Sequence, residues 1–106
     1  MVTRGEVWLV TFDPTVGSEI RKTRPALVVS PDDLNRSLPM VTIVPLTSGS
    51  QPTGFRVPVN FLGRPGLILP EQMRSVDRRR LVKHLGRVEE PVLQQTLETL
   101  RNLFAP

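Results

Sequence analysis

The stretch Arg24-Pro25-Ala26-Leu27-Val28-Val29-Ser30-Pro31 is the part of the sequence that decides the fold class. Its four central residues are apolar without interruption, which is typical of a β-strand covered on both faces. The two prolines disfavour helical backbone for the residue that precedes each of them. We therefore predict an interior strand at residues 26–30.

Short runs of β-forming residues lie on both sides of this strand, and prolines recur between them up to residue 70. Because proline breaks the interior of a helix, no helix of more than one or two turns fits before residue 71. A short helical turn is expected near residues 32–36, with Ser30 in position to cap it. The predicted strands are residues 6–12, 26–30, 41–46, 55–59, 66–69 and 72–76.

The end of the chain has the pattern of an amphipathic helix. Its apolar residues recur at spacings of four, three and four: Leu93, Leu97, Leu100 and Phe104. Pro91 suits the first helical position, and the two glutamates before it favour the positive end of the helix dipole. We predict a helix at residues 91–104.

Several short strands followed by one helix indicate a mainly β fold. The expected architecture is a small, strongly bent antiparallel sheet or partly open barrel, with the helix over one opening. A chain of 106 residues is expected to form a single domain. A domain of this size buries only about 65% of the surface of its unfolded chain, so a second chain could usefully cover apolar surface.

The composition excludes several kinds of active site. The chain has no cysteine, which removes disulfides, thiol nucleophiles and thiolate metal sites. It has one histidine, His84, so neither a histidine pair nor an all-histidine metal site can form within one chain. His84 itself is expected at the surface or in a structural contact. Acid–base chemistry must therefore use Asp, Glu, Arg, Lys, Ser or Thr.

The start of the sequence does not have the pattern of a targeting segment. Glu6 stands where a secretory signal would be apolar. No run approaches the roughly 20 apolar residues that cross a membrane. We expect the protein in the cytoplasm.

The formal charge of +4 is unevenly distributed. The first 50 residues carry five basic and five acidic residues, so the excess lies in the second part. Twelve of the 14 cations are arginines, which favour bidentate contacts with phosphate and carboxylate groups. This charge is compatible with nucleic-acid binding, and also with a solvated basic face in a protein from a GC-rich genome.

The loop at residues 13–25 is longer than a hairpin needs, and long ordered loops often carry function. It ends in Arg24, whose backbone is biased to an extended conformation by the proline that follows. An arginine held in this way can clamp a phosphate, or it can pair with Glu19 or Asp13 and stiffen the loop.

Two further segments carry polar side chains at strand positions. The strand predicted at 41–46 runs into Thr47, whose hydroxyl can bind a phosphoryl oxygen or a nearby backbone group. Polar and apolar residues alternate through residues 72–76, so one face of that strand is polar and basic. The arginines at 78–80 are expected to form a solvated turn that adds to the positive field.

Together these segments resemble the MazF/PemK toxins of bacterial toxin–antitoxin systems. The resemblance spans nearly the whole chain and rests on several ordered motifs. They are residues 4–8, 12–19, 24–31, 44–47, 71–77 and 80–81.

This resemblance implies an SH3-like barrel and a homodimeric, cytoplasmic endoribonuclease that cuts single-stranded RNA at a short sequence. It implies cleavage without a metal or other cofactor, with the 2′-hydroxyl of the RNA as nucleophile and 2′,3′-cyclic phosphate and 5′-hydroxyl ends as products. The catalytic pair of the family falls on Arg24 and Thr47. A cognate MazE-like antitoxin is expected to silence the enzyme by inserting an acidic segment into the RNA groove.

The chemistry of the side chains refines these roles. A guanidinium keeps its proton at neutral pH, so Arg24 is expected to stabilise transition-state charge and not to act as a base. Thr47 is expected to donate a hydrogen bond to the same phosphate, and Glu19 or water to assist proton movement. The residues expected to bind RNA are Pro14, Ser18, Lys22, Arg56, Gln72 and Arg74.

Two other functions are compatible with the same fold. One is a noncatalytic toxin that binds DNA gyrase, although that group tends to place its contacts on the C-terminal helix. The other is an SH3-like module that binds RNA without cutting it. Mapping the ends of an RNA incubated with the protein in EDTA separates all three.

Overall fold

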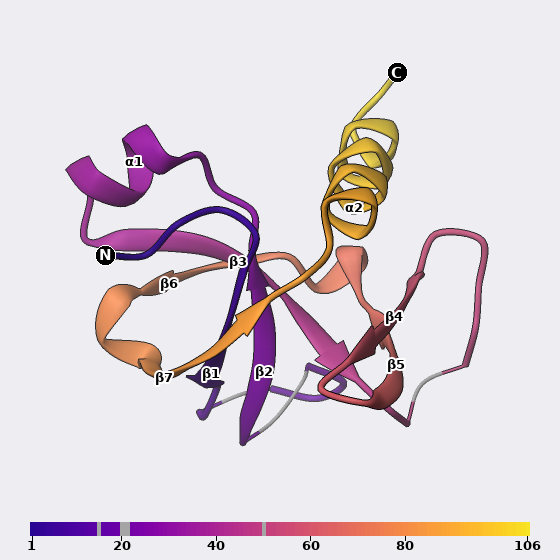
Figure 1. Cartoon of the computed structure of the whole chain (residues 1–106), viewed down its shortest axis with the longest axis horizontal. Helices are drawn as coiled ribbons and strands as arrows, with labels where there is room; N and C mark the ends of the chain where they lie inside the picture. The colour runs from indigo at the N-terminus through magenta and orange to yellow at the C-terminus, as the bar shows by residue number, and fades with distance from the viewer. Residues whose placement is uncertain (15, 20–21, 50) are drawn as a thin grey trace.

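The chain folds into a bent antiparallel sheet with a helix at its C-terminal end (Figure 1), which confirms the predicted mainly β fold. The computed structural model describes residues 1–14, 16–19, 22–49 and 51–106. The strands are β1 (Glu6–Thr11), β2 (Thr23–Val28), β3 (Met40–Thr47), β4 (Val57–Phe61), β5 (Arg64–Ile68), β6 (Arg74–Asp77) and β7 (Leu81–Arg87). The helices are α1 (Asp32–Ser37) and α2 (Glu90–Leu103), with 3-10 turns η1 (Pro70–Gln72) and η2 (Arg78–Arg80).

Strand β3 connects the two halves of the sheet. The strand order is β4-β5-β3-β2-β1-β7, and β6 also pairs with β3. The first half of β3, from Met40 to Ile43, pairs with β6, whereas Leu46 and Thr47 at its end pair with β5. The change of partner along one strand allows the sheet to bend, so that β4 and β5 stand apart from β1 and β7 (Figure 1).

Strand β2 supplies side chains to two separate core clusters. Ala26 and Val28 belong to one cluster, with Phe12 and Ile43. Leu27 belongs to the other cluster, on the opposite face, together with side chains of β3, β5 and α2. Because successive strand residues point to opposite faces, both faces of β2 are covered, as the continuous apolar run predicts.

The helix α2 covers one of these clusters. Leu93 and Leu100 are buried in it, and Leu97 packs against it. The prediction for the end of the apolar stripe is wrong. The helix stops at Leu103, and Phe104, the last residue of the predicted stripe, is 72% exposed. Figure 1 shows the last turn projecting beyond the strands, where no core remains to receive the phenylalanine ring.

Several predicted boundaries are wrong, each for a tertiary reason. The strand predicted at 26–30 begins at Thr23, because its first residues pair with the end of β1. The strands predicted at 55–59 and 66–69 are β4 and β5, displaced toward each other because only Leu62 and Gly63 separate them. The strand predicted at 72–76 begins at Arg74, since the preceding residues form η1.

The edge strand β7 was not predicted from the sequence. Its outward residues Val82, Lys83 and His84 are exposed, so it lacks a clean apolar alternation. Its pairing with β1 is also interrupted by two register shifts. The predicted helical turn exists as α1, but Ser30 does not cap it: the Ser30 hydroxyl donates instead to the Asn35 side-chain oxygen, at 2.5 Å.

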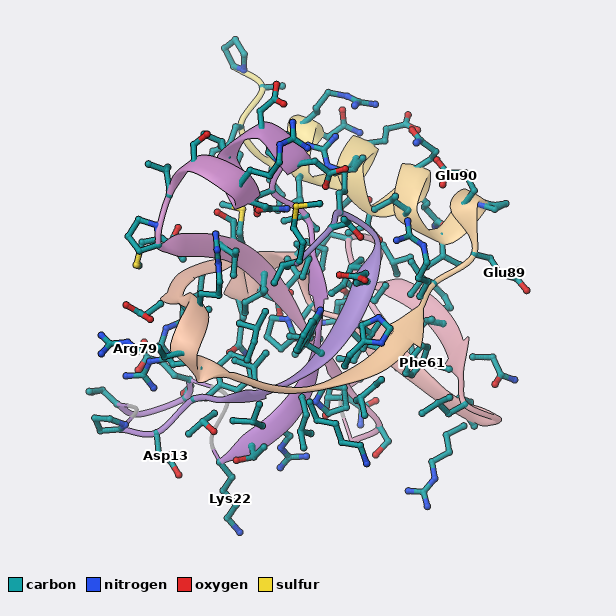
Figure 2. The ribbon with its side chains drawn as sticks, turned by 60° about the vertical axis from the view of Figure 1, so that its left-hand side comes forward. Asp13, Lys22, Phe61, Arg79, Glu89 and Glu90 are labelled. Carbon is teal, nitrogen blue, oxygen red and sulfur yellow. The ribbon has the colours of Figure 1, made fainter. Side chains whose placement is uncertain are left out.

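The three arginines of η2 were predicted as a solvated turn, but two of them hold the fold together. Arg78 donates to the backbone carbonyls of Asn35 and Leu38. Arg80 donates to the carbonyls of Thr11 and Asp13, at 3.0 and 2.8 Å, and so fixes the start of the loop between β1 and β2. Arg79 alone of the three points outward (Figure 2), and its Nε lies 2.9 Å from Asp77 Oδ1.

In the described part of the chain, no helix combines the length and the apolar character needed to cross a bilayer.

A polar cluster joins β7 to β1. His84 Nε2 lies 3.1 Å from the Glu6 carboxylate, and the His84 ring packs edge-on against Trp8 with centroids 5.3 Å apart. Partial burial tends to raise the pKa of the Glu6 carboxyl. The Thr3 backbone N–H, the Trp8 indole N–H and the charge of His84 outweigh this effect and leave the pKa of Glu6 below its usual value.

We expect this carboxylate to make stability fall with acid. Glu6 binds its proton more weakly in the folded chain than in the unfolded chain, whose pKa is near 4.5. Its stabilising effect is therefore complete above pH 4.5 and is lost as the pH falls through the lower pKa of the folded state.

Urea unfolding midpoints measured between neutral and acidic pH check this expectation. The Glu6→Gln variant should lose less stability than the unsubstituted protein over the acid range. Glu98→Gln, at an exposed position of α2, is the matched control and should follow the unsubstituted curve. Identical acid dependence in all three proteins would contradict the assignment.

Candidate active site

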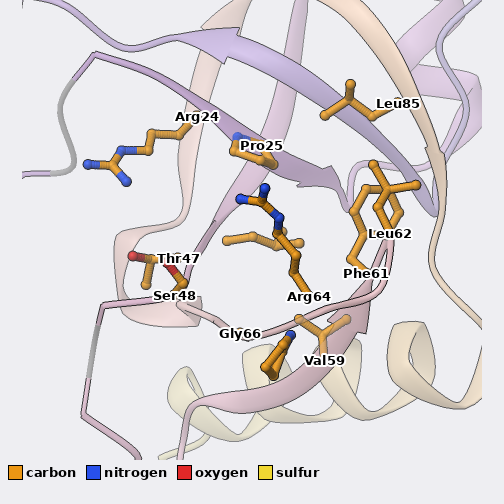
Figure 3. Close-up of a pocket in the computed structure, with 12 residues that line it drawn as sticks. Arg24, Pro25, Thr47, Ser48, Val59, Phe61, Leu62, Arg64, Gly66 and Leu85 are labelled. Atoms are coloured by element: carbon orange, nitrogen blue, oxygen red, sulfur yellow. The ribbon is translucent and has the colours of Figure 1, made fainter.

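Arg24 and Thr47 lie at the ends of two neighbouring strands. Ala26 of β2 is paired with Pro45 of β3, and Arg24 and Thr47 each lie two residues further along their strands. Because side chains on one face recur every second residue, both point to the same face of the sheet. They line one groove of about 470 Å³ (Figure 3), which we call the catalytic groove after the role predicted for this pair. The structure thus brings together the two residues predicted as the catalytic pair.

The hydroxyl of Thr47 is held at the strand end by its own loop. Its oxygen accepts a hydrogen bond from the Gly49 backbone N–H, at 3.3 Å. A hydroxyl that accepts in this way still has its own proton to donate to a ligand oxygen. The Thr47 hydroxyl can therefore accept the backbone hydrogen bond and donate to a phosphate at the same time, so the two alternatives considered from the sequence do not exclude each other.

The backbone of Gly66 passes close to Thr47. A methyl group built on Gly66 would lie 2.9 Å from the Thr47 carbonyl oxygen. Thr47 is paired with Leu67 of β5 at this point. A glycine is required here for steric reasons, because any larger residue would push β5 away from the end of β3.

Most of the other predicted residues gather in a second groove of about 660 Å³, which we call the recognition groove. The predicted residues that line it are Ser18, Glu19, Arg56, Gln72 and Arg74. Phe12, Glu71 and Met73 complete its lining. The loop that follows β1, the segment just before β4, the turn η1 and the start of β6 thus meet at one surface.

Pro14 and Lys22 lie outside both grooves. They belong to the base of the loop between β1 and β2, where the Lys22 backbone N–H donates to the Asp13 carboxylate at 3.1 Å. Figure 2 shows the Lys22 side chain extending away from the body of the protein. This position suits a cation that contacts a long ligand at its periphery.

The two arginines of the recognition groove are both engaged in the fold. Arg56 forms an ion pair with Glu71 at 2.6 Å and donates to the Gln51 carbonyl at 2.9 Å. Arg74 donates to the Phe12 carbonyl at 3.3 Å, and its guanidinium lies 5.9 Å from the centre of the Phe12 ring. Both arginines therefore have a structural role whatever they bind.

Glu19 lines the recognition groove and not the catalytic groove. Its carboxylate accepts a hydrogen bond from the Val16 backbone N–H at 2.6 Å. This bond closes a tight turn within the loop.

In the described residues, no group of three or more histidine, aspartate or glutamate side chains is arranged to hold a metal ion.

Comparisons with known proteins identify the family of this chain. Residues 3–104 match the family model described as PemK-like, MazF-like toxin of type II toxin–antitoxin system. The chain belongs to this toxin family. Endoribonuclease PemK of Escherichia coli is 38% identical over 107 residues, which cover 95% of this chain and 80% of that protein.

Solved structures of the PemK/MazF family share the fold. MazF from Deinococcus radiodurans superposes with a TM-score of 0.86 at 31% identity, over 96% of this chain and 94% of that chain. A MazE–MazF structure from the same organism has a TM-score of 0.78 at 30% identity, over 98% of this chain and 95% of that chain.

Of the residues that line the catalytic groove in this PemK/MazF chain, only Arg24 and Thr47 were predicted from the sequence, and three of the others are important for the shape and charge of the groove. They are Phe61, Leu62 and Arg64, on the hairpin of β4 and β5. The hairpin was predicted only as two unconnected strands, so no local pattern placed its tip beside Thr47. The pairing of β5 with the end of β3 is what brings it there.

We expect Gly66→Ala to displace Thr47. Close contact with a backbone oxygen typically costs about 1–3 kcal/mol, because the strands must separate to relieve it. The variant should unfold at lower temperature and shift the Thr47 amide resonance in a two-dimensional NMR spectrum.

Gly54→Ala is the matched control for this substitution. A methyl group at Gly54 would meet nothing within 4 Å, so neither the unfolding temperature nor the Thr47 resonance should change. If both variants behave alike, the close approach of β5 to Thr47 has no structural consequence.

Proposed function

We propose that this PemK/MazF-family chain is an endoribonuclease that cuts single-stranded RNA without a metal. The observation that carries the proposal is the placement of Arg24 and Thr47 side by side on one face, in a groove open to a ligand. The similarity to Endoribonuclease PemK supports it.

The proposed reaction is an internal transesterification. The 2′-oxygen of one nucleotide attacks the adjacent phosphorus and loses its proton as the new P–O bond forms. The bond from phosphorus to the 5′-oxygen then breaks, and that oxygen takes up a proton. The products are a 2′,3′-cyclic phosphate and a 5′-hydroxyl end, so the RNA itself supplies the nucleophile.

Arg24 would stabilise the extra negative charge on the phosphorane-like transition state. Its guanidinium can present two N–H groups to two phosphoryl oxygens, and it retains its proton at neutral pH. Thr47 would donate its remaining hydroxyl proton to the same phosphate. Fixed donors of this kind act most strongly on charge that develops in the transition state.

The proton of the 2′-hydroxyl would pass to Glu19 or to water. Glu19 is a carboxylate of the loop that precedes Arg24, and it lines the neighbouring groove. An RNA strand that spans both grooves would contact both Glu19 and Arg24. The group that accepts the proton of the 2′-hydroxyl is thus either the Glu19 carboxylate or a water molecule.

The recognition groove would select the bases around the cut. Gln72 can donate and accept hydrogen bonds at base edges, and Ser18 can do the same with its hydroxyl. Arg56, Arg74, Pro14 and Lys22 would contact the RNA backbone or the bases beside it. Specificity would then arise in one groove and bond cleavage in the other.

Two protein partners are also proposed. The MazE–MazF structure from Deinococcus radiodurans supports a MazE-like antitoxin as a partner of this chain. As the family resemblance implies, an acidic segment of the antitoxin would occupy the grooves that bind RNA. The exposed edges of β4 and β7 support a homodimer, because unpaired strand edges are usually covered. An enzyme of this kind would act on RNA in the cytoplasm.

We expect Arg24→Lys and Thr47→Val each to lower the kcat of RNA cleavage by about 100-fold, which is typical for loss of one preorganised donor. Lysine keeps the positive charge but loses the planar fork of donors. The measurement is cleavage of a long single-stranded RNA in EDTA, with the new ends identified chemically.

Thr47→Ser is the conservative control, since it keeps the hydroxyl, and it should retain most of the activity. Near-normal cleavage by Arg24→Lys would exclude a bidentate role for Arg24. If the unsubstituted protein makes no cuts at all in EDTA, the proposed function is wrong.

We expect Gln72→Ala to change where the RNA is cut more than how fast it is cut. Its amide would contribute to the choice of base and not to transition-state charge. Sequencing of cleavage ends from a mixed RNA pool measures the change in preferred sequence. Gln95→Ala on the exposed face of α2 is the control. Equal weakening of cleavage at every sequence would exclude base recognition by Gln72.

A further inference from the structure

The hairpin of β4 and β5 forms a wall of the catalytic groove that the proposed reaction does not use. Strand β5 pairs with Thr47 through Leu67, and Arg64 lies three residues further along, roughly 10 Å away at the usual rise of a strand. Arg64 is paired across the hairpin with Phe61. In Figure 3 the Arg64 side chain stands between the Arg24 and Thr47 end of the groove and the Phe61 and Leu62 end.

The lining of this end of the groove is mostly apolar. Phe61, Leu62, Pro65 and Leu85 all face the groove and are all at least partly exposed. The ring of Phe61 lies against the backbone of Gly86. A methyl group added to Gly86 would lie only 3.4 Å from this ring. A flat, supported aromatic face beside apolar side chains is a surface on which a nucleobase can stack.

Arg64 adds a second cation to the groove. Its side chain is exposed, and it has no hydrogen-bond or ion-pair partner among the described residues. Arg56, Arg74, Arg78 and Arg80, in contrast, all bind groups of the protein. An arginine with free donors, next to a phosphate site and an apolar wall, matches one nucleotide: a phosphate for the guanidinium and a base for the wall.

The turn that carries this wall is strained at an exposed leucine. Leu62 and Gly63 both have positive φ, at 53° and 76°, as a two-residue type I′ turn requires. Asparagine followed by glycine is the favoured pair in such a turn, and a leucine with positive φ is an outlier. Leu62 is also 69% exposed, so burial in the fold does not account for it. Backbone outliers of this kind cluster at ligand-binding sites.

We propose that Phe61, Leu62 and Arg64 form a nucleotide subsite beside the scissile phosphate. The apolar wall binds the base of a nucleotide that flanks the cut, and Arg64 binds the next phosphate. This inference rests on the proposed function, because it takes the ligand of the groove to be RNA.

The test uses binding and not cleavage as its readout. The probe is a short RNA that contains the mapped cleavage site, with a 2′-deoxynucleotide at the scissile position so that it cannot react. Arg64→Ala should weaken binding about tenfold and reduce the slope of log Kd against log salt by about 0.7, the value for one phosphate contact with a single strand. Arg64→Lys should restore the slope.

Arg101→Ala is the matched control, because it removes the same charge from an exposed position on α2 outside both grooves. It should leave the affinity and the slope nearly unchanged. If Arg64→Ala and Arg101→Ala behave alike while the unsubstituted protein still cuts the all-ribose RNA, the subsite is wrong and the proposed function stands. If the all-ribose RNA is not cut, the proposed function itself fails.

The base contact is tested with Leu62→Asn and an abasic nucleotide. Removal of the flanking base should weaken binding about tenfold in the unsubstituted protein and much less in Phe61→Leu or Leu62→Asn. Leu62→Asn should also raise Tm by about 4 °C, since asparagine tolerates positive φ. A higher Tm with an unchanged abasic effect would overturn the base contact. Loss of the dimer with unchanged RNA affinity would show that the wall is a protein interface instead.

Discussion

The backbone pairing between β2 and β3 is the interaction on which both the core and the groove depend. Its register, Leu27 with Val44 and Val28 with Ile43, sends alternate side chains into two core clusters on opposite faces. The same alternation continues toward the open end of the strands, where Arg24 and Thr47 take the places of apolar residues. The proposed catalytic pair is thus the outer continuation of the core, held by the most deeply buried strands.

Strand β3 also joins the two grooves mechanically. Ile43 is paired with Arg74 of the recognition groove, and Thr47 at the other end belongs to the catalytic groove. Between these points, the Leu69 N–H donates to the Pro45 carbonyl at 2.9 Å and ties the start of η1 to the same strand. A ligand that contacts both grooves therefore meets surfaces whose separation is set by one strand. Such rigidity suits a site that must place a scissile bond relative to the bases it recognises.

The net charge does not distinguish arginines that hold the fold together from arginines that line a groove, and Arg56 and Arg74 do both. Arg78 and Arg80 donate to backbone carbonyls and hold segments distant in the sequence together. Arg24 and Arg64 line the catalytic groove. Much of the positive charge in the second part of the chain therefore has a structural role, and the arginines that line the two grooves occupy defined positions.

Local patterns were sufficient for the elements that have a strong period. The apolar run of β2 and the apolar stripe of α2 predict those two elements, because the buried faces of a strand or helix require apolar residues at regular spacings. The motifs around Arg24 and Thr47 likewise identify the family and predict these two residues as its catalytic pair. Strand β7 and the tip of the β4–β5 hairpin leave no such mark, because exposed residues and bulges interrupt the period. Only the tertiary structure decides that Ser18, Gln72 and Arg74 share one groove and that Arg64 lines another groove together with Thr47. Strand register and the bend of the sheet set these neighbours, and neither is encoded in any short stretch of the chain.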